Sequence, residues 1–230
     1  MTESIPTVYL IATPIGNLED ITMRAVRMLR EVDLVLCEDT RVARKLLSAY
    51  DIKKPLESYH QHSAPAKLVA IGDMLAGGKS IAFVSDAGTP GISDPGGMLV
   101  RTLVERFGDA IRIVPIPGAS AVLAALSISG FFTDRFRFLG FPPHKKGRKT
   151  FFQTIAEIPE AVVLYESKHR IEKALEALTS TIGMRQIVVA RELTKQFESI
   201  YRGTAPECLA ALKNDDMRGE FVVVIAPAKV

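Results

Sequence analysis

The chain of 230 residues has little of what several protein classes require, beginning with cysteine. Only Cys37 and Cys208 are present, too few for a disulfide framework and without metal-site spacing. No apolar run approaches the roughly 20 residues that a membrane-spanning helix needs. The first residues carry no basic stretch, so we expect no secretory signal. These absences predict a reduced, soluble, cytoplasmic protein that has no membrane partner.

Three catalytic signatures are also absent. The loop that follows the first apolar run, TPIGN at 13–17, has a single glycine, whereas a dinucleotide fingerprint needs G-x-G-x-x-G. Neither the P-loop pattern nor the G-x-S-x-G elbow occurs anywhere in the chain. The chain therefore lacks the primary signatures of nicotinamide redox enzymes, P-loop hydrolases and serine hydrolases.

Positive charge is concentrated in one segment, although the net charge of the whole chain is only +3. Segment 131–150 has six basic residues and one acidic residue, and the rest has 23 basic and 25 acidic. Its basic residues are Arg135, Arg137, Lys145, Lys146, Arg148 and Lys149. Five phenylalanines are interleaved with them, a pattern that suits contacts with RNA phosphates and bases. A strand core beside a solvated loop explains the phenylalanines equally well.

Apolar runs alternate with helical patterns in the first half of the chain, where Asn17 or Asp20 is a candidate cap for the first helix. Strands are predicted at 8–12, 34–37, 81–84 and 111–114, and helices at about 21–32, 66–76, 98–107 and 121–127. Such alternation predicts a mainly parallel sheet with helices on both faces.

The rhythm changes after about residue 118. Strands are predicted at 136–141, 161–165, 186–191, 199–203 and 221–226, and helices near 150–156, 169–182 and 206–213. The segment ARELTKQFESIYRG looks like a hairpin, which favours a mixed sheet. We therefore predict two α/β domains, an N-terminal one at 1–117 and a C-terminal one at 118–230.

Four unusual loops follow the predicted strands of the first domain, at 13–17, 38–41, 85–97 and 115–120. In open α/β sheets, ligands bind at the carboxyl ends of strands. The third loop is rich in glycine and proline, which let the backbone approach a ligand and fix its course. These loops predict a site for a small polar ligand, and a set of tight turns is the simpler alternative.

Charged residues beside the strand ends are candidates for function. Asp39 and Arg41 fit either a structural ion pair or a substrate clamp. Glu192, Lys195 and Lys168 fit a cleft or a solvated surface equally well. His60 and His62 would face the same way on a strand, but no further ligand stands nearby, so no metal site is predicted.

Eight segments occur in the order seen in the tetrapyrrole-methylase-like superfamily. They are IATPIGNLEDIT, CEDTR, SDAGTPGISDPG, PIPGASA, GFPP, YESKHR, ARELTK and YRG…RGEFVVVI. The chain most resembles the ribosomal branch, whose members methylate the 2′-hydroxyl of a cytidine ribose in 16S rRNA. The resemblance implies two α/β domains, S-adenosylmethionine in a cleft between them, and a homodimer. It also implies a substrate cytidine in the decoding region of the small ribosomal subunit.

Cofactor-binding positions also follow from the resemblance. It assigns the cofactor to Gly88, Thr89, Pro90, Ile92, Ala119, Ser120, Tyr165, Glu166, Ser167, Ala190, Leu193, Gly219 and Glu220. Asp86 is expected to shape the first cofactor loop. The chain departs from the branch at Lys168, where a proline is usual, and in the GFPP, VARKLL and HQHS segments. These departures flank the expected RNA side, whereas the cofactor loops match the family pattern.

Methyl transfer from a sulfonium requires in-line attack, so catalysis should depend heavily on positioning the two substrates. A group that accepts the proton of the 2′-hydroxyl would help, and Asp39, Glu192 and Lys195 are the candidates. Arg41 and the basic residues of segment 131–150 are expected to bind rRNA phosphates. Two alternatives are a methyltransferase that acts on a small tetrapyrrole and a non-catalytic RNA-binding module.

Overall fold

The computed structural model describes residues 5–60, 63, 65–215 and 217–228. The chain forms two compact units, Met1–Ser120 and Ala121–Val230. Each unit is a sheet packed with helices, which confirms the predicted fold class of two α/β domains. In the described ranges, no helix combines the length and the apolar character that crossing a bilayer requires.

The first unit is built on a parallel sheet of five strands in the order β3-β2-β4-β1-β5. These are β1 Thr7–Ile11, β2 Leu34–Cys37, β3 Leu56–Ser58, β4 Ser80–Val84 and β5 Arg112–Ile116. Successive side chains point to opposite faces, so Ile81 and Phe83 enter one apolar cluster while Ala82 and Val84 enter the other. The sheet is therefore buried on both faces, as predicted.

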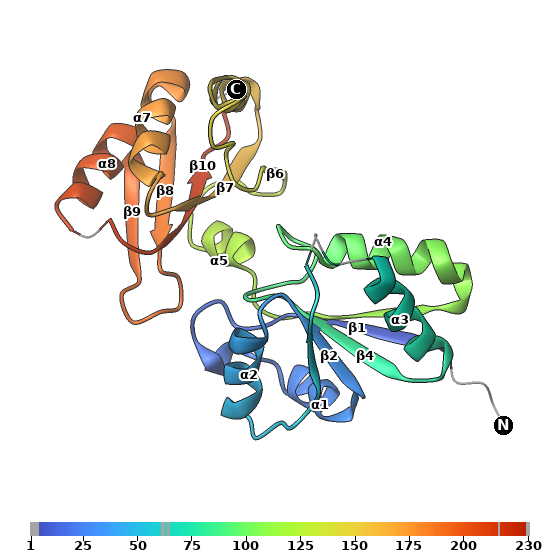
Figure 1. The fold of residues 1–230 in the computed structure, drawn as a ribbon. Coiled ribbons are helices and arrows are strands. Elements are labelled where there is room, and N and C mark those ends of the chain that lie inside the picture. The colour runs from blue at the N-terminus through green and yellow to red at the C-terminus, as the bar shows by residue number, and fades with distance from the viewer. Residues whose placement is uncertain (1–4, 61–62, 64, 216, 229–230) are drawn as a thin grey trace. The chain divides into compact units, whose positions relative to one another are not determined.

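Helices cover the two faces of this sheet in pairs (Figure 1). Helices α1 Met23–Glu31 and α2 Thr40–Ala49 pack on one face, and α3 Pro65–Ala76 and α4 Gly96–Phe107 pack on the other. Two short 3-10 turns, η1 Leu18–Asp20 and η2 Gly108–Ala110, complete the unit.

The start of α1 differs from the expectation, because the hydroxyl of Thr22 caps this helix and accepts a hydrogen bond from the Ala25 amide. Asn17, the predicted cap, instead caps η1. Neither α2 nor β3 was predicted from the sequence.

The second unit has a mixed sheet in the order β6-β7-β10-β8-β9. The strands are β6 Phe136–Phe138, β7 Ala161–Ser167, β8 Gln186–Arg191, β9 Ser199–Thr204 and β10 Glu220–Ile225. Strand β6 is parallel to β7 and every other pair is antiparallel, with β8 and β9 forming the predicted hairpin.

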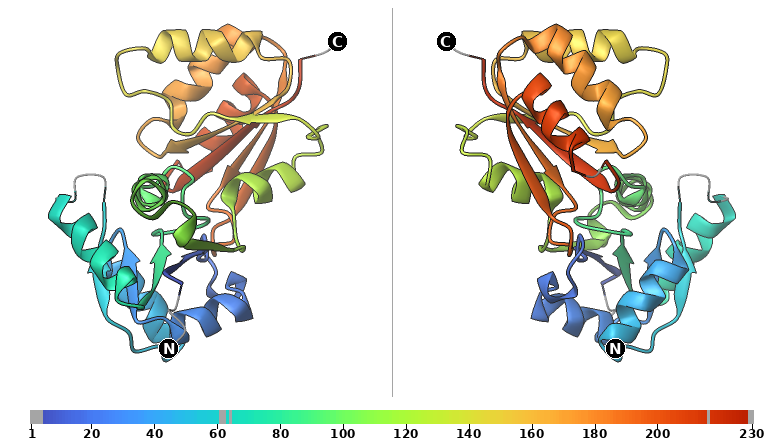
Figure 2. Two further views of the ribbon diagram at one scale, coloured as in Figure 1. Left: turned by 90° about the vertical axis from the view of Figure 1, so that its right-hand side faces the viewer. Right: turned by 90° about the vertical axis from the view of Figure 1, so that its left-hand side faces the viewer.

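Three helices and one short helix cover the two faces of the mixed sheet. Helices α6 Arg148–Glu157, α7 Ile171–Ile182 and α8 Ala205–Lys213 bury one face, and α6 and α7 lie side by side over it (Figure 2). The short helix α5 Ala121–Ser127 packs against β10 and β7 and buries Val122, Ala125 and Leu126.

Candidate functional site

The chain reverses direction at two neighbouring strands of the first unit. Strands β4 and β1 are neighbours at the middle of the sheet. The chain leaves β1 through α1 and returns in β2, on the β4 side of β1. It leaves β4 through α4 and returns in β5, on the opposite side of β1. The two connecting helices lie on opposite faces of the sheet. At such a reversal the loops at the carboxyl ends of the strands diverge and leave room for a ligand. The first and third predicted loops follow these two strand ends.

Backbone hydrogen bonds join those two loops. Thr13 and Gly88 exchange both of their backbone bonds, at N–O distances of 2.9 and 3.1 Å. The Thr13 hydroxyl donates to the Ser85 carbonyl at 3.2 Å. Gly88 has a φ of +80°, and a Cβ there would lie 3.4 Å from Cγ2 of Ile15. That distance is an ordinary contact, so it is the positive φ that favours glycine at this position.

The loop after β5 joins the same place. The Thr89 hydroxyl donates to the Ala119 carbonyl at 3.1 Å, and the Ala12 amide donates to the Ile116 carbonyl at 3.1 Å. A Cβ at Gly118 would lie 3.0 Å from the Cβ of Ala12. The structure therefore brings Gly88, Thr89 and Ala119 together at one edge of the sheet.

Asp94 is a loop residue that the sequence analysis did not single out. Its carboxylate accepts hydrogen bonds from the amides of Gly91, Ile92 and Gly96, at 2.7 to 3.1 Å. A Cβ at Gly96 would lie 2.8 Å from an Asp94 carboxylate oxygen, so glycine is required there. Asp94 thereby fixes the loop that carries buried Pro90 and exposed Ile92. The available signal was an aspartate at the start of α4.

Three acidic residues meet beside this edge. Asp86 accepts a hydrogen bond from the Asp39 amide at 3.1 Å, and Glu38 accepts one from the Asp86 amide at 3.1 Å. Burial raises the pKa of both Glu38 and Asp86 above their usual values. Asp86 thus ties the end of β2 to the end of β4, and its role in the cofactor loop stays a prediction.

Asp39 forms an ion pair with Arg41, one of the two arrangements that the sequence left open. Arg41 Nη2 lies 2.6 Å from Asp39 Oδ2, and the Asp39 carboxylate also caps α2 through the Arg41 amide. The side-chain hydrogen bond from Arg41 is the main cause that lowers the pKa of Asp39 to about 2. A carboxylate with so low a pKa accepts protons poorly.

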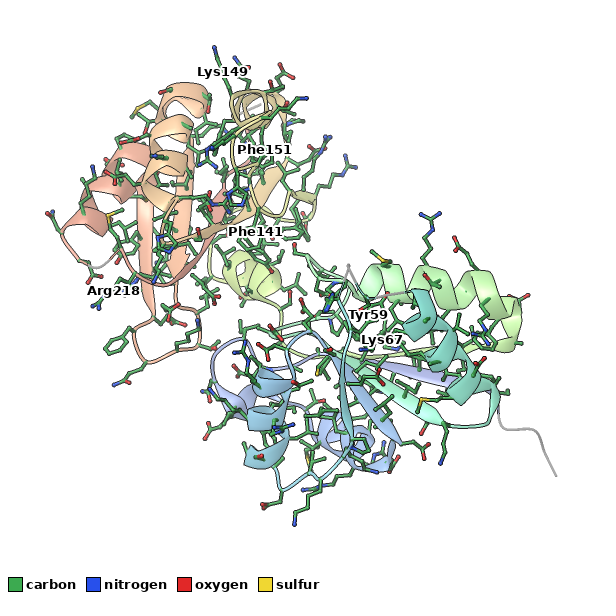
Figure 3. The ribbon with its side chains drawn as sticks, viewed as in Figure 1. Tyr59, Lys67, Phe141, Lys149, Phe151 and Arg218 are labelled. Atoms are coloured by element: carbon green, nitrogen blue, oxygen red, sulfur yellow. The ribbon has the colours of Figure 1, made fainter. Side chains whose placement is uncertain are left out.

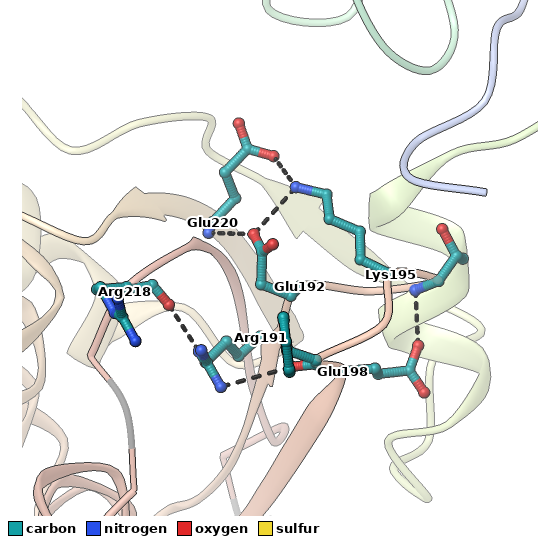
Figure 4. Close-up of polar contacts among 8 residues, drawn as sticks. Arg191, Glu192, Lys195, Glu198, Arg218 and Glu220 are labelled. Atoms are coloured by element: carbon teal, nitrogen blue, oxygen red, sulfur yellow. Dashed lines mark hydrogen bonds and ion pairs between the residues drawn. The ribbon is translucent and has the colours of Figure 1, made fainter. Parts of the chain in front are cut away.

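Glu192, Lys195 and Glu220 form one cluster in the second unit (Figure 4). Lys195 Nζ lies 2.9 Å from carboxylate oxygens of both Glu192 and Glu220, and the Glu220 amide donates to Glu192 at 2.9 Å. Glu192 has a φ of +50°, and a Cβ at Gly219 would lie 2.6 Å from Cγ of Glu192. Gly219 therefore makes room for the Glu192 side chain.

The cluster sets the protonation of its members. Burial opposes ionisation of Glu192, but the hydrogen bonds from Lys195 and the Glu220 amide outweigh it and lower the pKa of Glu192. Burial also opposes the charge of Lys195, and the two carboxylates outweigh it and raise the pKa of that amine. Lys195 is thus held as a cation, which removes it as a neutral proton acceptor.

At the end of β7, the fully buried carboxylate of Glu166 lies between two arginines. It is 2.9 Å from Arg170 Nε and 3.5 Å from Arg148 Nη1. The Arg148 side chain is only 18% exposed and its guanidinium stacks on Phe152. Glu166 also accepts a hydrogen bond from the Ser167 amide at 2.8 Å. These bonds give Glu166 and Arg148 a structural role in this unit.

The remaining predicted residues of the second unit separate into buried and exposed groups. Tyr165 packs against Phe138 and Phe141, with centroid distances of 4.9 and 5.4 Å, and Ala190 and Leu193 are buried. The exposed cations are Arg135, Arg137, Lys145, Lys146 and Lys149. Lys149 extends outward from α6 (Figure 3), and Arg137 pairs with Glu160 at 3.1 Å. Of the five phenylalanines in segment 131–150, Phe131 and Phe138 are half-buried, and Phe132, Phe136 and Phe141 are exposed like the basic residues.

Among the residues that the structure describes, no three His, Cys, Asp or Glu side chains are grouped so as to hold a metal ion. His60 lies in the described part of the chain, while His62 lies outside it.

Known proteins match this chain along most of its length. The family model of the tetrapyrrole (corrin/porphyrin) methylases matches residues 7–209. The ribosomal RNA small subunit methyltransferase I of Synechocystis sp. is 46% identical over 96% of this chain and 78% of its own length. The protein of the same name from Bacillus subtilis is 43% identical over 94% of this chain and 74% of its own length.

The fold itself also has relatives among solved structures. A crystal structure of diphthine synthase superposes with a TM-score of 0.72, at 17% identity, over 96% of this chain and 90% of that one. At this identity the likeness concerns the fold alone.

These matches, together with ligand loops at a reversal in a parallel sheet, define a protein of the tetrapyrrole methylase class. The chain belongs to the tetrapyrrole methylase family, in its branch of ribosomal RNA small subunit methyltransferases I. The predicted membership is therefore confirmed. The chain spans about three quarters of the length of the relatives it matches.

Proposed function

We propose that this protein transfers the methyl group of S-adenosylmethionine to the ribose 2′-oxygen of a cytidine in the decoding region of 16S rRNA. The observation that carries the proposal is the identity of 43 to 46% with relatives named as small-subunit rRNA methyltransferases. Action on rRNA would place the protein in the cytoplasm.

The joined loops of the first unit fit one end of this cofactor. S-adenosylmethionine supplies an electrophilic methyl group on a positively charged sulfur. Such a ligand suits an edge that offers backbone carbonyls, a nearby carboxylate at Asp86 and a glycine at position 88 that allows close approach. Gly88, Thr89, Pro90, Ile92, Ala119 and Ser120 would hold the amino-acid end. Tyr165, Glu166, Ser167, Ala190, Leu193, Gly219 and Glu220 remain the predicted adenosine side.

Glu192 is the candidate that best suits proton acceptance from the ribose hydroxyl. The Asp39 carboxylate is ion-paired with Arg41, which lowers its pKa to about 2, and Lys195 is held as a cation. Glu192 is an ionised carboxylate fixed by Lys195, so it has a defined place and the correct protonation state. Its lowered pKa makes it a weak base, so positioning of the two substrates would supply most of the rate.

Exposed cations would bind the rRNA backbone. Arg41, Arg135, Arg137, Lys145, Lys146 and Lys149 are exposed, whereas Arg148 is engaged by Glu166. Arg41 and Arg137 each form an ion pair with an acid, so in the described structure Arg135 and the three lysines carry the unpaired charge of segment 131–150.

Incubation with labelled S-adenosylmethionine and 30S particles from a strain that lacks this activity tests the proposal. We expect label in 16S rRNA at one cytidine, at an alkali-resistant linkage that marks a 2′-O-methyl group. Label in free precorrin and none in 30S particles would establish the tetrapyrrole alternative. A failure to bind S-adenosylmethionine in calorimetry would establish the non-catalytic alternative. Sedimentation of the same sample tests the expected homodimer.

A further inference from the structure

Two helices of the first unit carry a second concentration of positive charge. Helix α2 has three basic residues and no acidic one, and α1 has three arginines and one glutamate. We call these six exposed residues the α1–α2 basic face: Arg24, Arg27, Arg30, Arg41, Arg44 and Lys45. Along the sequence this charge is not apparent, because residues 19–45 contain six acidic residues as well as these six basic ones.

Both helices are oriented by the same apolar cluster. Ala25 and Leu29 of α1, and Ala43 and Leu47 of α2, are buried in the cluster on one face of the sheet. Because buried positions recur every three to four residues, the basic side chains between them must point to solvent. Figure 1 shows the two helices on the same side of the sheet.

Little within the described structure neutralises this charge. Of the six residues, Arg41 alone forms an ion pair within the described part of the chain, with Asp39, and Arg30 donates to the backbone carbonyl of Tyr50 at 2.9 Å. No ion pair or hydrogen bond among the described residues engages the side chains of Arg24, Arg27, Arg44 and Lys45. Exposed cations of this kind, on two helices that pack on one face of the sheet, attract an anionic polymer.

A groove opens beside two residues of the basic face, Arg27 and Arg30. It has a volume of about 550 Å³ and lies between α1, η1 and the end of α2. Its lining includes apolar Ile21, Met23 and Val26, cationic Arg27 and Arg30, and one acid, Glu19. The hydroxyl of Tyr50 donates to the Leu18 carbonyl and the Arg30 guanidinium to the Tyr50 carbonyl, so the walls of the groove are joined.

The two helices begin at the edge that carries the candidate cofactor loops. Thr22 caps α1 shortly after the loop that follows β1, and Asp39 caps α2 directly after β2 while its amide binds Asp86. Arg24 and Arg41 therefore lie in the first turns, and Arg30 and Lys45 lie one to two turns further away. The basic face thus leads from this edge outward along the unit.

We propose that the α1–α2 basic face binds single-stranded rRNA next to the target nucleotide, with phosphates on the cations and one unstacked base in the groove. The proposal rests on the proposed function and names the surface that it would use. An apolar floor beside arginines suits an unstacked base, because bases bind through their faces and phosphates through cations. Symmetric self-association through this face would bring arginines against arginines, which disfavours a second copy as the occupant.

A variant that removes four of the cations tests the proposal: Arg24→Gln, Arg27→Gln, Arg44→Gln and Lys45→Gln together. Binding to unmodified 30S particles is measured from low to high salt. Each single-strand phosphate contact contributes about −0.7 to the slope of log affinity against log salt. We therefore expect the magnitude of this slope to be smaller by about 3 in the variant. Affinity for S-adenosylmethionine and the melting temperature should not change.

A control removes the same number of positive charges elsewhere, through Lys79→Gln, Arg101→Gln, Lys173→Gln and Lys213→Gln, of which Lys173 alone is unpaired within the described residues. The control should keep the slope of the wild type. An unchanged slope in the first variant, or an equal loss in both, would overturn the assignment of this face. So would conversion of a dimer to monomers by the first variant with rRNA binding intact. If the wild type itself binds no 30S particles, the proposed function fails as well.

Discussion

A single carboxylate holds the glycine-rich loop of the first unit. Asp94 accepts three backbone N–H groups, from Gly91, Ile92 and Gly96, and alanine at position 94 would leave all three without that acceptor. We expect Asp94→Ala to lower the free energy of unfolding by about 1–3 kcal/mol. The dissociation constant for S-adenosylmethionine should rise because the loop loses its fixed conformation.

The control for this variant is Asp94→Asn, which retains one carbonyl oxygen as acceptor and should fall between the wild type and Asp94→Ala. Calorimetry measures cofactor binding and thermal melting measures stability. If Asp94→Ala melts like the wild type and binds the cofactor equally well, Asp94 does not organise the loop.

The basic segment at 144–149 divides into two parts with different tasks. Lys145, Lys146 and Lys149 are exposed, while Arg148 pairs with Glu166 and stacks on Phe152. Replacing the three lysines by glutamine should lower the salt slope of rRNA binding by about 2, at unchanged stability. Arg148→Gln should instead lower the melting temperature, because it removes one partner of a buried carboxylate.

Filter binding over a salt series and thermal melting separate these two effects. If Arg148→Gln changes the slope by as much as one lysine does and leaves the melting temperature unchanged, then Arg148 belongs with the RNA-binding residues.

Elements that have a pattern of their own could be predicted from the sequence, and elements held by distant partners could not. The apolar run of β2 and the strands of the β8–β9 hairpin were predicted with their bounds nearly correct. Strand β3 has three half-buried residues and exists through its pairing with β2. Helix α2 is capped by Asp39, whose carboxylate suggested a ligand more readily than a helix cap.

The same distinction applies to the candidate site. Glycine and proline in the loop at 85–97 marked the candidate ligand edge, because the backbone requires those residues locally. The pairing of Arg148 with Glu166 joins residues that lie 18 positions apart, and no local pattern indicates it. Gly219 likewise makes room for Glu192, which is distant in sequence.

Each unit of the whole molecule has its own apolar core and one buried cysteine. Cys37 lies in β2 in the core of the first unit, and Cys208 lies in α8 in the core of the second. Burial raises the pKa of both thiols to about 11, so only about one thousandth of either is thiolate at pH 8 in the folded protein. Each thiol should therefore react with a thiol reagent only when its own unit unfolds.

Labelling of the two thiols in increasing urea then reports the stability of each core. Glu166→Ala leaves Arg148 and Arg170 without their buried partner and should destabilise the second unit by about 3 kcal/mol. We expect the urea midpoint for labelling of Cys208 to fall by about 2 M while that of Cys37 stays the same. Mass spectrometry distinguishes the two labelled peptides. Equal shifts of both midpoints would show instead that the two cores unfold together, because a substitution in one core would then lower the unfolding midpoint of the other by the same amount.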